Sequence, residues 1–200
     1  PTRSEQERIL SSHGAHAVQH IPELHMVIAD VSSSDPSSAI LELFGEPGVA
    51  SADLDRTRTA TGSFGTTGAD TGWALRRVGA VPMDPKGFST LAILDTGLDI
   101  SRANLTGQVM QGWSAFGGDE LSDPNGHGTA MAEIAASSST GRGSVPGIAP
   151  SGVLVLPLQV LDAQGVGRDS DIIRGIVEAV GRGADVILMS FAGTRSEEHT

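Results

Sequence analysis

The sequence predicts an α/β fold built on a parallel sheet, and two features of the chain support this. Apolar residues predominate at 91–94, 153–161 and 185–193, as expected of strands, and the short run 91–94 is expected to be buried. Between the last two runs, Asp171 to Gly181 has apolar residues at helical spacing. Strands that alternate with helices in this way are typical of a parallel sheet covered by helices.

The first apolar run leads directly into Asp95. A strand that ends there places the carboxylate at the carboxyl edge of the sheet, where open α/β sheets carry their chemistry. Further along, His127 stands between two glycines and begins a segment with apolar residues at helical spacing. We therefore expect an aspartate at a strand end and a histidine at a helix start, in that order.

Five segments occur in a specific order: 73–78, the Asp95 strand, the His127 helix, 147–161 and 185–193. Over residues 73–194 this set resembles the subtilisin-like serine proteases. The resemblance implies a three-layer α/β domain with a parallel sheet, and a serine endopeptidase with an Asp-His-Ser triad. Asp95 and His127 match the first two members of the triad. We expect the serine to lie beyond residue 200, so that this chain alone is inactive.

Asp95 and His127 are the candidate catalytic residues. A histidine can take a proton from a serine hydroxyl only if its other ring nitrogen is held in the right tautomer, and a partly buried carboxylate achieves this. Asp99 is a candidate for supporting this pair, and the alternative is an acid in a solvated turn.

Two glycine-containing segments are the candidate substrate-binding residues. By resemblance they present two backbone edges, between which an extended peptide lies as an added strand. The segments are Gly165, Val166 and Gly167, and Ser190, Phe191, Ala192 and Gly193. The alternative is an ordinary loop glycine for the first segment and a buried strand end for the second.

The chain departs from the family pattern at two places that bear on its chemistry. Arg102-Ala103-Asn104-Leu105 replaces His-Pro-Asp-Leu, whose aspartate binds calcium in some members, and Glu133 stands where a small residue usually packs. The acids before His127, namely Asp119, Glu120 and Asp123, are the candidate calcium ligands, with a solvated acidic loop as the alternative. The reaction itself requires no cofactor.

Residues 1–58 are predicted to form a separate α+β unit of the order helix, strand, strand, helix, strand, with the last strand at 49–57. This order resembles the ferredoxin-like propeptide of subtilisin-like proteases, which implies that the protein's own propeptide is a binding partner. Residues 59–72 are rich in Thr, Gly and Ser and are predicted to be a linker where processing occurs. Residues 195–200 are expected to be a foreign tail.

Four of the six histidines lie in this N-terminal unit, at positions 13, 16, 20 and 25. Because histidine titrates near pH 6.5, the cluster suggests a pH-sensitive latch in which protonation places like charges close together. Surface histidines without a role are the alternative.

Composition limits the possible partners. The 200 residues carry a net charge of −11, and this acidic balance argues against nucleic acid or an anionic membrane as a partner. The chain contains no cysteine. No apolar run is long enough to span a membrane. The resemblance implies a bacterial protein that is secreted or otherwise extracytoplasmic, acting on peptide or protein substrates.

Two other functions remain open at this point. Asp95-Thr96-Gly97 after an apolar run is also typical of aspartic proteases, which need two such carboxylates. A subtilisin-like fold kept as a binding module, without catalysis, is the second alternative.

Overall fold

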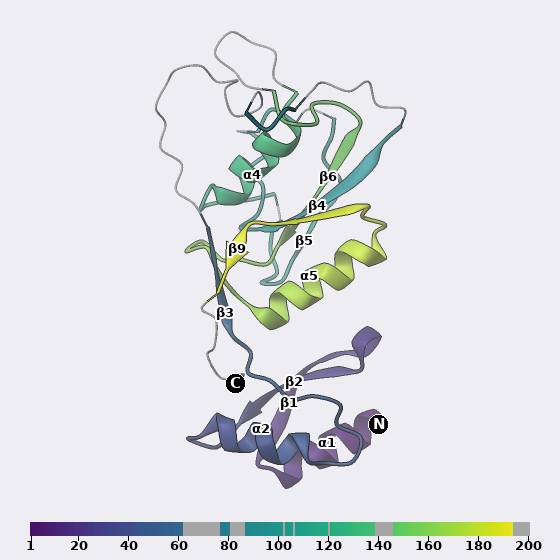
Figure 1. Ribbon diagram of the computed structural model, residues 1–200, viewed down its shortest axis with the longest axis vertical. Helices are drawn as coiled ribbons and strands as arrows, with labels where there is room; N and C mark the ends of the chain where they lie inside the picture. The colour runs from purple at the N-terminus through teal and green to yellow at the C-terminus, as the bar shows by residue number, and fades with distance from the viewer. Residues whose placement is uncertain are drawn as a thin grey trace. The chain divides into compact units, whose positions relative to one another are not determined.

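The computed structural model describes residues 1–61, 77–80, 87–101, 103–105, 107–119, 121–138 and 146–193. The chain divides into two compact units, Pro1–Arg56 and Thr57–Thr200. Figure 1 shows the helices and strands of each unit. Within the described residues, no helix is long and apolar enough to cross a membrane.

The N-terminal unit contains two helices and one hairpin. Helix α1 (Arg3–Ser12) begins with a capping box in which Thr2 and Glu5 bond to each other's backbone amides. Strands β1 (Ala15–Ile21) and β2 (Met26–Val31) pair in antiparallel fashion around the short helix η1 (Pro22–Leu24). Helix α2 (Pro36–Phe44) follows, and the Asp35 side chain caps its start.

The predicted last strand of this unit, at 49–57, is wrong. Residues 49–56 form no strand, and the next strand, β3 (Thr57–Ala60), belongs to the second unit. The reason is that β3 finds its hydrogen-bond partners in strands more than a hundred residues further along the chain. The ferredoxin-like description therefore stays a prediction for the N-terminal unit, whose sheet has two strands.

The second unit is built on a four-stranded sheet in which every pairing is parallel, as the sequence predicts. The strand order is β5 (Trp113–Ser114), β6 (Val153–Gln159), β4 (Ser89–Asp95) and β8 (Val186–Met189). Strand β4 lies between β6 and β8, and its residues Ala92 and Leu94 are completely buried in the core that α5 covers.

Helices cover both faces of this sheet, which gives the three layers (Figure 1). One face packs Leu94, Leu156 and Leu158 against α5 (Asp169–Gly181). The other face packs Ile93 and Val155 against α4 (His127–Ala136). Side chains alternate between the two faces because successive strand residues point to opposite sides of a sheet.

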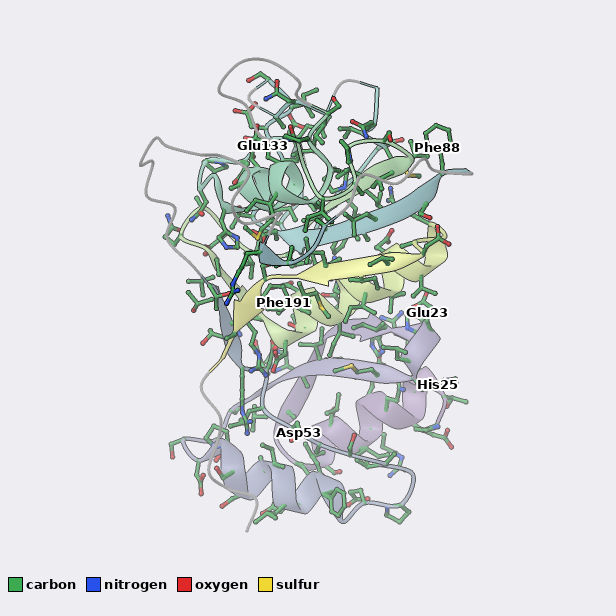
Figure 2. All side chains as sticks on the ribbon, turned by 45° about the horizontal axis from the view of Figure 1, so that its top comes forward. Glu23, His25, Asp53, Phe88, Glu133 and Phe191 are labelled. Carbon is green, nitrogen blue, oxygen red and sulfur yellow. The ribbon has the colours of Figure 1, made fainter. Side chains whose placement is uncertain are left out.

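Glu133 does not disturb the packing of α4 on the sheet. Its side chain is half-buried on the helix (Figure 2), whereas Ala132 and Ala136 make the buried contact with the sheet. The acid at this position therefore lies beside the helix–sheet interface.

A second, antiparallel sheet of three short strands lies in the same unit. Strand β3 is its middle strand, flanked by β7 (Val166–Arg168) and β9 (Phe191–Ala192). These two flanking strands contain most of the predicted substrate-binding residues.

Candidate active site

Asp95 is the last residue of β4 and is 1% exposed. Because side chains alternate along a strand, it points to the same face as Ile93, which is the face that α4 covers. The strand thus delivers a buried carboxylate to the start of α4.

His127 is the first residue of α4, and its Nδ1 lies 2.7 Å from Oδ1 of Asp95. The same carboxylate oxygen accepts a hydrogen bond of 2.8 Å from the Thr96 amide. Among the described residues, the other oxygen, Oδ2, is buried without a hydrogen-bond partner. The structure therefore brings the two predicted catalytic residues together and orients the imidazole through one oxygen.

The glycine after His127 permits this close approach. A Cβ on Gly128 would lie 2.2 Å from the Gly97 carbonyl oxygen and 3.1 Å from the Asp95 Cβ. Any larger residue would push the first turn of α4 away from the end of β4. Gly126, before the histidine, has a φ of 91°, a left-handed conformation that favours glycine.

Asp123 holds the two loops of the site together, a role that sequence reasoning missed. It is buried, and its Oδ1 accepts hydrogen bonds of 2.8 Å from the Thr96 hydroxyl and from the Gly126 amide. Its Oδ2 accepts 2.8 and 2.6 Å bonds from the amide and hydroxyl of Thr129. The only available signal was its position shortly before Gly-His-Gly.

Calcium binding at Asp119 and Asp123 stays a prediction. Four protein donors already occupy the Asp123 carboxylate, and Asp119 Oδ1 accepts a bond from the Leu121 amide. In the described part of the chain, no three acidic, histidine or cysteine side chains cluster as metal ligands would. Glu120 and Arg102 lie outside the described residues.

The contacts of Asp99 are those of an acid in a turn, which was the alternative to a role in supporting the catalytic pair. Its carboxylate accepts bonds of 2.9 and 2.6 Å from the amide and hydroxyl of Ser101, and its own amide donates to the Thr129 hydroxyl. The residue therefore shapes the turn that follows β4.

The second ring nitrogen of His127, Nε2, lies 2.8 Å from the backbone oxygen of Thr61. A carbonyl oxygen can only accept a hydrogen bond, so Nε2 carries the proton in this contact. With Nδ1 directed at a carboxylate, the two contacts together favour the charged imidazolium form.

The pKa values of the pair follow from these contacts. Burial alone would lower the pKa of His127, but hydrogen bonds to the Asp95 carboxylate and the Thr61 carbonyl outweigh it and raise the pKa above 6.5. Burial raises the pKa of Asp95, against the opposing effect of hydrogen bonds from His127 and the Thr96 amide. The pKa of each group therefore depends on the charge of the other.

The predicted substrate-binding segments lie on the two sides of β3. The Ala60 amide donates a 2.8 Å bond to the Gly165 oxygen, and the Thr61 amide donates a 3.0 Å bond to the Ser190 oxygen. Pairing with β3 also involves the remaining predicted residues of these edges, Val166, Gly167, Phe191 and Ala192, while Gly193 follows directly. Figure 2 labels Phe191 on β9.

The space between these two edges, called the groove below, holds the chain's own segment 57–61. Sequence reasoning divided this segment between a strand and a linker. Gly165, with a φ of 75°, gives the segment room, because a Cβ there would lie 3.2 Å from the Ala60 Cβ. The signal that could have identified the segment was its composition, Thr-Arg-Thr-Ala-Thr, since β-branched threonine favours extended backbone.

Comparisons with known proteins identify the family of this chain. Residues 88–200 match the model of the subtilase family. Thermitase from Thermoactinomyces vulgaris is 37% identical over 105 residues, which cover 52% of this chain and 37% of thermitase. The major intracellular serine protease of Bacillus subtilis (strain 168) is 39% identical over 108 residues, covering 52% of this chain and 34% of that protein.

A longer match extends into the N-terminal unit. Subtilisin-like protease 6 of Trichophyton rubrum is 31% identical over 195 residues, covering 86% of this chain and 42% of that protein. The chain therefore spans less than half the length of each of these relatives. The site geometry and the matches lead to one conclusion: this chain belongs to the subtilase family.

Proposed function

We propose that the protein containing this chain is a serine endopeptidase in which Asp95 and His127 are two members of the catalytic triad. The observation that carries the proposal is the buried Asp95–His127 pair, with the other ring nitrogen of His127 directed at the backbone carbonyl of an extended segment in the groove. The triad serine, the oxyanion-binding groups and the cleavage of peptide substrates are part of the proposal.

The residues present support general base catalysis. With Nδ1–H directed at Asp95, a neutral His127 presents the lone pair of Nε2 to the groove, where it can take the proton of a serine hydroxyl. The imidazolium that forms is stabilised by the buried carboxylate and then donates the proton to the leaving amine. The serine must therefore reach the position between Nε2 and the scissile carbonyl.

We further propose that the protein is made as a zymogen, with residues 1–56 as its propeptide. Segment 57–61 lies in the groove as a substrate would, and the Thr61 carbonyl contacts the catalytic histidine. This arrangement supports cleavage of the peptide bond after Thr61, within the linker predicted for processing. In this chain the Thr61 carbonyl occupies the position at Nε2 that the serine hydroxyl would take.

The aspartic protease alternative finds no support. It needs a second carboxylate that shares a proton with Asp95, whereas within the described residues the titratable group that contacts Asp95 is His127 at 2.7 Å. Membership of the subtilase family also accounts for the glycines around His127.

The location of the protein remains a proposal. Two of the relatives carry the word intracellular in their names, so the relatives do not establish one compartment. Secretion is proposed on the family resemblance alone.

The proposal is tested with the longer protein that supplies the serine. The wild-type protein should hydrolyse an unstructured protein such as casein and react in equimolar amount with a fluorophosphonate. His127→Ala should abolish both activities, whereas His16→Ala, which changes an exposed histidine in the N-terminal unit, should not. A wild-type protein that binds peptides but neither cleaves them nor reacts with the probe would show a binding module instead.

A further inference from the structure

Arg58 of β3 makes a two-point contact with Asp169, the first residue of α5. Its Nε donates to Oδ1 of the carboxylate, and its Nη2 donates to Oδ2 at 2.7 Å. Both side chains are 28% exposed, so the pair is partly shielded from water. Such fork-to-fork pairing of guanidinium and carboxylate is stronger and more directional than a single contact between charges.

The space for this arginine is formed by rigid elements on both sides. Asp169 is held in the first turn of α5, where a negative charge is favoured by the helix dipole. On the other side lies Gly193, directly after β9. A Cβ at Gly193 would lie 2.2 Å from Nη1 of Arg58 and 2.8 Å from its Cδ. Arg58 can therefore take its observed position because residue 193 has no side chain.

The distance of Arg58 from the reacting carbonyl can be counted along β3. Thr61 presents its carbonyl to His127 Nε2 and is therefore in the position of the residue before the cleaved bond. The Ala60 and Thr61 amides bond to Gly165 and Ser190, so the register of the segment is set from both edges. Counting back from Thr61, Arg58 occupies the fourth position before the cleaved bond.

We propose that Asp169 makes this enzyme select arginine at the fourth position before the cleaved bond. The inference rests on the proposed peptidase function and names a residue that determines its specificity. A substrate with arginine there reproduces both hydrogen bonds of Arg58. Glutamine leaves the half-shielded carboxylate without a cationic partner, glutamate is repelled by it, and lysine offers a single ammonium in place of the planar fork.

The first measurement compares peptide substrates on the wild-type enzyme that includes the serine, after the bond following Thr61 has been cleaved. The peptides have the form Thr-X-Thr-Ala-Thr followed by a chromogenic leaving group, with arginine, lysine, glutamine or glutamate at X. We expect kcat/KM to fall in that order, with arginine about tenfold above glutamine, since a partly exposed ion pair discriminates less than a fully buried one. This comparison needs no variant, so it does not depend on the folding of one.

The second measurement assigns the preference to Asp169. In Asp169→Asn the ratio of kcat/KM for the arginine and glutamine peptides should fall close to one. Asp171→Asn is the matched control, because it removes the same charge two residues later in the same helix, where the carboxylate lies 3.6 Å from Arg174. In that control the ratio should stay at the wild-type value.

The outcomes separate the inference from the function on which it rests. Hydrolysis of the arginine and glutamine peptides at equal rates would overturn the inference and leave the peptidase proposal intact. A preference for arginine that survives in Asp169→Asn would overturn the role of Asp169. If the wild-type enzyme cleaves no peptide of the set and no unstructured protein, the proposed function itself is overturned, and the inference with it.

Discussion

Asp123 accepts a 2.8 Å hydrogen bond from the hydroxyl of Thr96, which joins the loop after β4 to the loop before α4. The Thr96 hydroxyl also accepts a 3.0 Å bond from the Gly128 amide. The relative position of Asp95 and His127 therefore depends on a buried hydrogen-bond network formed by Thr96 and Asp123.

Replacing Asp123 by alanine should destabilise the protein by about 3 kcal/mol or more, because it leaves several buried donors without an acceptor. Urea unfolding measures the change in the free energy of unfolding. Asp119→Ala, which removes an exposed acid from the same loop, should cost less than about 1 kcal/mol. Equal effects of the two substitutions would contradict the central role of Asp123.

In the active enzyme, Asp95→Asn should lower kcat by about 10⁴-fold while the fold remains intact, because an asparagine cannot hold His127 in the required tautomer or stabilise its charge. Steady-state kinetics on a peptide substrate measure this effect, and circular dichroism checks the fold. A loss smaller than about tenfold would be incompatible with a triad role for Asp95.

Ala60→Pro should slow the cleavage of the zymogen after Thr61. Proline removes the amide that bonds to the Gly165 oxygen at 2.8 Å and so weakens the seating of β3 between its two neighbours. The N-terminus of the mature enzyme, read by mass spectrometry, should be Gly62 in the wild type. Ala60→Ser keeps the amide and should be processed normally, and a mature N-terminus elsewhere would refute the assignment of the cleaved bond.

His127 should titrate above pH 6.5 in the chain with β3 in the groove. Its raised pKa means that the folded protein binds the proton more tightly than the unfolded chain does. The resulting stabilisation is complete below pH 6.5 and is lost as the pH rises through the raised pKa. The imidazole resonances in an NMR titration give this pKa, and Asp95→Asn should lower it; an unchanged value would exclude Asp95 as a cause.

His13 gives the stability of the N-terminal unit a pH dependence, whereas the latch suggested by the four histidines stays a prediction. Its Nε2 lies 2.9 Å from Glu46 and its Nδ1 lies 3.3 Å from Glu42, contacts that raise the pKa of His13. Protonation therefore strengthens the link between the end of α1 and α2. The stabilisation is fully present below pH 6.5 and is lost as the pH rises through the raised pKa.

The thermal midpoint of this unit should accordingly decrease as the pH is raised from 5.5 to 8.5. The substitution His13→Gln should make that decrease smaller. His16→Gln is the control, because the side chain of His16 is 68% exposed and lies 3.8 Å from Asp30. A pH dependence that is identical in wild type and His13→Gln would contradict the proposed contribution of His13.

The sequence by itself determined the elements whose signals are local. The buried strands β4 and β6 follow from continuous apolar runs, and the alternation of strands with helices predicts the parallel sheet. The run at 185–193 gives instead the edge strand β8, in which Val186 and Met189 are exposed. The end of β4 at Asp95 and the start of α4 at His127 follow from an abrupt change in polarity and from flanking glycines. These patterns act over a few residues, so they can be recognised without knowing what lies beside them in space.

Only the tertiary structure decided which distant groups meet. The pairing of β3 with β7 and β9, the four bonds to Asp123 and the contact of Arg58 with Asp169, 111 residues away, depend on the register of sheets and the placement of α5. A threonine-rich segment such as 57–61 can extend against any free strand edge, and its composition does not specify which one. The unpaired backbone groups at the edges of β7 and β9 determine where the segment pairs, and these edges exist only once the chain has folded.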